Sequence, residues 1–137
     1  MAEKYIVCSG KGGSGKSTVT VGLAAALASA GKRVLCADAD ISVRSLDLLL
    51  ETGEDILFNW YDAAKGNCKK KDAVYDTLYK GVSLLPAPKS TEELTYDEFY
   101  ELILSFESSY DYILFDAENC GTAFDFAAKI CDKAIIV

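Results

Sequence analysis

The chain has 137 residues, of which 50% are hydrophobic, and its 21 acidic and 14 basic side chains give a formal net charge of -7. This length and hydrophobicity suit one folded domain and exclude an intrinsically disordered chain, while the acidic balance argues against a surface that binds nucleic acid. Five widely spaced cysteines and no histidine indicate neither a disulfide framework nor a zinc site, which favours a reducing, cytoplasmic environment.

Short apolar runs alternate with helical patterns along the chain. The runs typical of buried strands are residues 5–8, 34–37, 112–115 and 134–137, with a weaker fifth at 82–85. Helices are expected from Ser17 to Gly31, from Asp55 to Lys65, from Tyr96 to Ser108 and after Thr122, and 73–79 is also assigned to a helix. This alternation predicts an α/β fold with a mostly parallel sheet.

Two of the expected helices carry more detailed predictions. The first places Val19, Leu23, Ala26, Leu27 and Ala30 on one face. The third begins with a capping box formed by Thr95 and Glu98, and its buried stripe consists of Phe99, Leu102, Ile103 and Phe106.

A glycine-rich loop follows the first strand and opens the first helix. Gly10, Gly15, Lys16 and Ser17 fit the phosphate-loop pattern G-x-x-x-x-G-K-[ST] in the context that this pattern requires. Backbone N–H groups of such a loop point at phosphate oxygens, Lys16 should reach the β- and γ-phosphates, and Ser17 should be a magnesium ligand. The expected nucleotide-binding residues are Gly10, Lys11, Gly12, Gly13, Ser14, Gly15, Lys16, Ser17 and Thr18.

Aspartates follow two of the other expected strands. Asp116 comes directly after the run 112–115, and Asp38 and Asp40 come after 34–37. Carboxyl ends of parallel strands meet at one edge of a sheet, so these carboxylates should lie near the phosphate loop and help to hold Mg²⁺. The plainer interpretation, that they cap helices or shape turns, remains open.

Several motifs together resemble the MinD/ParA superfamily of ATPases. "KGGSGKST" looks like its deviant Walker A motif, and residues 31–51 are similar to the second strand and switch I of the septum site-determining, MinD-like branch. Residues 81–93 and 110–121 resemble the third strand and the Walker B strand with switch II. The resemblance implies a three-layer α/β/α P-loop NTPase fold with about five strands over residues 1–137. It also implies that the chain is either the N-terminal part of a longer protein or a truncated relative, since family members continue beyond the position of Val137.

The resemblance further implies a function. In that family two ATP-bound subunits face each other, and the lysine matched by Lys11 reaches the partner's phosphates, so the catalytic residues would be Lys11, Lys16 and Asp40. Ser17, Asp38 and Asp116 would surround the metal. The expected protein is a slow, Mg²⁺-dependent ATPase switch that forms a homodimer with ATP and positions division or related bacterial machinery.

The resemblance also suggests partners and a location. An activator or a membrane or cell-pole partner would bind through residues absent from this chain, and no direct binding of nucleic acid is expected. The protein would be cytoplasmic, and peripheral at the inner membrane where a longer form carries a C-terminal amphipathic helix.

One motif departs from the family pattern and leaves alternatives open. Switch II usually reads D-x-P-[AP]-G, but "DAENCG" has Glu118 in the place of proline and Gly121 one residue late. The alternatives are a pilus, flagellar or partition relative, or a non-catalytic nucleotide-binding or assembly module. An iron-sulfur relative is a further alternative, suggested by Cys120.

Overall fold

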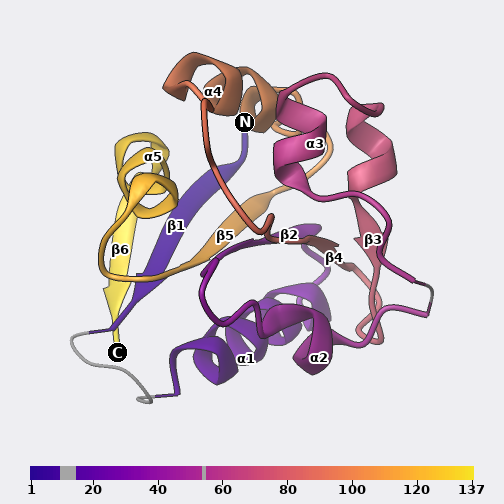
Figure 1. The fold of residues 1–137 in the computed structure, drawn as a ribbon. Helices are drawn as coiled ribbons and strands as arrows, with labels where there is room; N and C mark the ends of the chain where they lie inside the picture. Colours follow the sequence, from indigo (N-terminus) through magenta and orange to yellow (C-terminus); the bar gives the residue numbers. More distant parts are fainter. Residues whose placement is uncertain (10–14, 54) are drawn as a thin grey trace.

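Six strands lie side by side in one sheet in the computed structural model, which describes residues 1–9, 15–53 and 55–137 (Figure 1). They are β1 (Glu3–Cys8), β2 (Val34–Ala39), β3 (Tyr75–Asp76), β4 (Val82–Leu85), β5 (Tyr112–Ala117) and β6 (Lys133–Ile136). Their order is β3-β4-β2-β5-β1-β6, and every neighbouring pair is parallel except β3 and β4. The sheet is therefore mostly parallel, as predicted.

Helices cover both faces of this sheet (Figure 1). On one face lie α1 (Lys16–Ser29) and α2 (Leu46–Leu50). On the other lie α3 (Trp60–Ala64), α4 (Tyr96–Leu104) and α5 (Thr122–Ile130), and a 3-10 turn, η1 (Lys70–Ala73), packs against α3. This three-layer arrangement confirms the predicted fold class.

The double covering explains why the strand sequences are continuously apolar. All six residues of β2 are buried, and they alternate between the two faces. Leu35 and Ala37 pack with α3, α4 and α5, whereas Val34 and Cys36 pack with α1 and α2. A strand between two helical layers has no face for polar side chains.

The start of α4 agrees with the sequence prediction. Thr95 Oγ1 accepts a hydrogen bond from the N–H of Glu98, and Glu98 Oε1 accepts one from the N–H of Thr95, which completes the capping box. The predicted stripe of α4 is buried, with Phe99, Leu102, Ile103 and Phe106 between 0% and 7% exposed. The helix ends at Leu104, earlier than predicted, and turns follow.

Two of the predicted helices are wrong in extent or type. Only Trp60–Ala64 of the predicted helix 55–65 is helical, because Asn59 caps α3 in a capping box with Asp62. The segment 73–79 contains β3 instead of a helix, because its backbone pairs antiparallel with the otherwise open side of β4. The isolated pairing between Thr52 and Thr77 extends this edge.

The packing of α1 also differs from the prediction. Its buried residues are Thr20, Val21 and Ala24, while Val19 and Ala26 of the predicted face are exposed. An alanine-rich helix has little hydrophobic contrast between its faces, so the position of the phosphate loop decides which face meets the sheet. Among the described residues, no helix is both long and apolar enough to cross a lipid bilayer.

Candidate nucleotide-binding site

The carboxyl ends of three adjacent strands form the candidate site. Because β5 lies between β2 and β1, Asp116 on β5 is in register with Asp38 on β2 and with Val7 on β1. The helix α1 starts at Lys16, and its N-cap Gly15 has a φ of 83°, a left-handed conformation that favours glycine. The sheet therefore delivers the predicted carboxylates to the start of α1.

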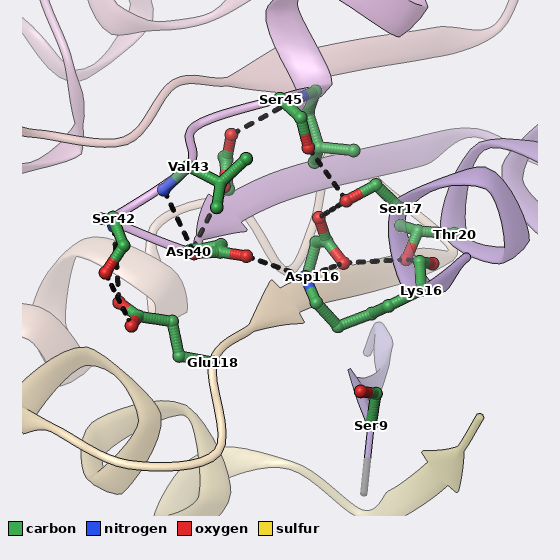
Figure 2. A network of polar contacts seen from close by, with 12 residues as sticks. Ser9, Lys16, Ser17, Thr20, Asp40, Ser42, Val43, Ser45, Asp116 and Glu118 are labelled. Atoms are coloured by element: carbon green, nitrogen blue, oxygen red, sulfur yellow. Dashed lines mark hydrogen bonds and ion pairs between the residues drawn. The ribbon is translucent and has the colours of Figure 1, made fainter. Parts of the chain in front are cut away.

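Lys16 is the cation of this cluster (Figure 2). Its Nζ lies 2.7 Å from Asp116 Oδ1 and 3.1 Å from Asp40 Oδ2. Burial acts to lower the pKa of Lys16, but the hydrogen bonds and negative charges of Asp116 and Asp40 outweigh burial and raise that pKa above its ordinary value. Lys16 is therefore positively charged at the position where an anionic ligand would enter.

Asp116 is the centre of the polar network. Its side chain is fully buried, Ser17 Oγ donates to its Oδ2 at 2.7 Å, and Thr20 Oγ1 donates to its Oδ1 at 3.2 Å. Ser45, from the loop before α2, donates through Oγ to Ser17 Oγ at 2.8 Å (Figure 2). The structure thus brings together Ser17 and Asp116, which sequence analysis had placed at the metal.

Asp38 holds the loop between β2 and α2. Its Oδ1 accepts from the N–H of Asp40 at 3.0 Å and its Oδ2 from the N–H of Leu46 at 3.3 Å. Burial raises the pKa of Asp38 to about 7; the charges of Asp116 and Asp40 add to this, while the two backbone hydrogen bonds oppose it. The carbonyl oxygen of Asp38 accepts from Trp60 Nε1 at 2.8 Å, which ties the loop to the core.

Part of the predicted loop lies outside the described residues, namely Gly10, Lys11, Gly12, Gly13 and Ser14. Of the remaining predicted residues, Gly15, Lys16, Ser17, Thr18 and Asp40 line a cleft of about 380 Å³, together with Ser9, Val43, Ser45, Leu48 and Leu49, which were not predicted. The predicted Asp38 borders a separate cleft instead.

A larger cleft, of about 540 Å³, lies elsewhere, between residues such as Arg33, Gly81 and Tyr110. These residues precede β2, β4 and β5, so the cleft lies at the amino ends of the strands. Ligands of open α/β sheets bind at the carboxyl ends, which favours the smaller cleft as the nucleotide site.

Sequence reasoning missed several residues of the network: Thr20, Ser42, Ser45, Trp60 and Glu118. Thr20 had a sequence signal, because it lies four residues after Lys16 and hence on the same face of α1, and Glu118 was noted as a departure from the switch II pattern without a role in the site. The others reach the site through loops or from another layer of the fold.

The donor atoms suit magnesium. The hydroxyl of Ser17 and the carboxylates of Asp116 and Asp38 are hard oxygen ligands, which Mg²⁺ prefers, and Mg²⁺ usually keeps water and phosphate oxygens as further ligands. In keeping with this, no group of three or more acidic, cysteine or histidine side chains converges as a ready-made metal site within the described parts of the chain. Cys120 is exposed and free.

A lysine and a serine that open a helix after the first strand, faced by an aspartate of the neighbouring strand, define a P-loop nucleotide-binding protein. Residues 5–125 match the family described as the CobQ/CobB/MinD/ParA nucleotide binding domain, and the chain belongs to this family. The predicted MinD/ParA membership is thereby confirmed.

Individual relatives point to the MinD branch. The septum site-determining protein MinD of Helicobacter pylori is 36% identical over 141 residues, covering 100% of this chain and 53% of that protein. Among solved structures, MinD of Pyrococcus horikoshii OT3 complexed with Mg-ADP has a TM-score of 0.85 and 33% identity, covering 100% of this chain and 58% of that chain. The MinC:MinD cell division protein complex of Aquifex aeolicus has a TM-score of 0.83 and 33% identity, covering 98% of this chain and 55% of that chain. The chain therefore spans about half the length of the relatives it matches.

Proposed function

We propose that this chain is the phosphate-binding portion of a MinD-like ATPase that binds ATP with Mg²⁺ and hydrolyses it slowly. The observation that carries the proposal is the convergence of Lys16, Ser17 and Asp116 at the start of α1. Family membership and the MinD relatives support the same function. Residues 1–137 would form one P-loop ATPase domain, complete or partial.

Each polar group has a distinct role in this proposal. Lys16 exchanges its two carboxylate partners for phosphate oxygens, and the N–H groups at the start of α1 point toward the same anion. Ser17 and Asp116 would hold the metal, and Asp38 would support it. Mg²⁺, when bound, neutralises part of the negative charge on the phosphates. Asp40, released from Lys16, orients the attacking water.

The proposal includes a nucleotide-dependent homodimer in which Lys11 acts on the partner's phosphates. This part rests on the family resemblance, as do the location in the cytoplasm or at the membrane periphery and the role in placing the division apparatus. The MinC:MinD complex of Aquifex aeolicus is a precedent for a protein partner.

A Mg²⁺-dependent ATPase assay on the wild type and on Lys11→Ala and Lys16→Ala tests the proposal, with Lys71→Ala, an exposed lysine of η1, as the control. We expect Lys16→Ala to abolish ATP binding. Lys11→Ala should keep binding but lose about 100-fold in turnover, because it removes charge stabilisation from the transition state. Sedimentation with ATP and with ADP then measures the dimer.

The outcomes separate the alternatives. ATP binding without turnover by the wild type would indicate a non-catalytic nucleotide-binding module. Turnover that survives Lys11→Ala would refute the action of Lys11 on a partner subunit.

A further inference from the structure

The loop after β5 carries two side chains that reach to opposite sides. Glu118 contacts the loop between β2 and α2, and Asn119 Oδ1 accepts from the N–H of Ser9 at the end of β1, at 3.3 Å. Because β5 lies between β2 and β1, a loop at its end can touch both neighbouring loops. The segment 118–119 therefore connects the loop after β2 with the end of β1.

The contact on the β2 side has two hydrogen bonds to one carboxylate. Ser42 Oγ donates to Glu118 Oε2 at 2.7 Å, and the N–H of Ser42 donates to Glu118 Oε1 at 3.3 Å (Figure 2). Hydrogen bonds to a charged acceptor are stronger than neutral ones, and two of them fix a direction as well as a distance. Proline, which the family pattern has at position 118, could not accept either bond.

Ser42 lies in a tight turn together with Asp40. The N–H of Arg44 donates to the carbonyl oxygen of Asp40 at 2.7 Å, and the N–H of Val43 donates to Asp40 Oδ1 at 3.3 Å. A side chain that holds Ser42 therefore also holds the carboxylate of Asp40, which forms the ion pair with Lys16.

We propose that Glu118 is a positioning residue, which clamps Ser42 and thereby holds Asp40 at the phosphate site. The catalytic consequence of this clamp rests on the proposed ATPase function, but the clamp itself does not. Loss of the clamp frees the exposed residues 42–44 of this turn, while Asp38 still accepts hydrogen bonds from the N–H groups of Asp40 and Leu46 on either side.

Trypsin offers a direct measure of the clamp, because Arg44 lies in the turn and is exposed. Cleavage after Arg44 requires local opening, so its rate reports the stability of the closed turn. We would follow the fragment ending at Arg44 by mass spectrometry, without nucleotide, for the wild type, Glu118→Ala, Ser42→Ala and the double variant. The matched control is Glu101→Ala, which changes an exposed glutamate of α4.

We expect cleavage about fivefold faster in Glu118→Ala, since that factor corresponds to one or two hydrogen bonds lost at a solvent-accessible site. Ser42→Ala should be faster as well, and the double variant should be no faster than Glu118→Ala, because both changes remove the same contact. Ser42→Thr keeps the hydroxyl, so its rate of cleavage after Arg44 should equal that of the wild type. Wild-type rates in Glu118→Ala, or fully multiplicative effects in the double variant, would overturn the clamp.

The positioning role has a separate readout in steady-state kinetics. Glu118→Ala should lower kcat about tenfold and leave KM for ATP within about twofold, because Asp40 is assigned to the attacking water and not to ATP binding. An unchanged kcat with faster cleavage would overturn the positioning of Asp40. A wild-type protein without ATPase activity would refute the proposed function and with it this role, while the cleavage rates would still decide the clamp.

Discussion

Removal of Lys16 should destabilise the protein itself, apart from any effect on nucleotide binding. The ammonium group contacts two carboxylates, Asp116 at 2.7 Å and Asp40 at 3.1 Å, and Asp116 is fully buried. Lys16→Ala leaves these negative charges together in a site with little solvent. Loss of one partner of a buried ion pair costs about 3 to 5 kcal/mol, and we expect about 3 kcal/mol because the Lys16 side chain is 13% exposed.

Urea unfolding at pH 8 in EDTA and without nucleotide measures this loss. The single tryptophan, Trp60, is buried and provides the fluorescence signal. Lys65→Ala is the control, because Lys65 forms an ion pair with Glu98 on the surface, at 3.1 Å, and such pairs contribute little.

A second variant tests the physical cause. Lys16→Ala combined with Asp116→Asn should be more stable than Lys16→Ala alone, because the fully buried charge is then absent as well. The reasoning is refuted if Lys16→Ala costs no more than Lys65→Ala at pH 8, or if the added Asp116→Asn brings no recovery.

Three further predictions concern the support of the site. Burial raises the pKa of Asp38 from an ordinary value of 3.8 to about 7, so its contribution to stability falls as the pH rises between these values, because the unfolded chain releases the proton first. In EDTA, Asp38→Asn should therefore remove a total decrease of about 4 kcal/mol from the free energy of unfolding over this pH range, and parallel pH profiles would contradict this. Trp60→Phe leaves the buried carbonyl of Asp38 without its indole donor and should cost about 3 kcal/mol in thermal unfolding; a loss below about 1 kcal/mol would mean that this hydrogen bond contributes nothing. Thr20→Val removes a hydroxyl that donates to Asp116 at nearly constant shape and should cost about 1 to 2 kcal/mol in urea unfolding, whereas Thr18→Val, at an exposed position, should cost much less.

Local patterns in the sequence were sufficient to predict the parts of the fold that depend on interactions between residues close together in the chain. The apolar runs predicted β1, β2, β4, β5 and β6 because a strand covered on both faces must be apolar throughout. The start of α4 was predictable because the capping box of Thr95 and Glu98 lies within four residues. The same holds for Lys16 and Ser17, since their place in the motif sets their place at the start of α1.

The pairing of distant segments was decided only by the tertiary structure. The strand β3 exists because β4 offers an open edge, and its own sequence favoured a helix. The helix α3 is short because Asn59, whose own backbone is extended, caps it in a capping box with Asp62. The pairing of β3 with β4 does not depend on local propensity, so periodicity could not reveal it, whereas the capping box of Asn59 and Asp62 is a local signal that the predicted helix 55–65 did not use.

The same distinction applies to the site. The sequence by itself predicted Lys16, Ser17, Asp38, Asp40 and Asp116 as site residues, because each follows an apolar run or belongs to the glycine loop. The sheet order then placed β5 between β1 and β2, which puts Asp116 against Lys16 and brings Glu118 to Ser42 across 76 positions of sequence. Such contacts depend on which strands are neighbours, and strand order is a property of the packed layers, not of any local stretch of residues.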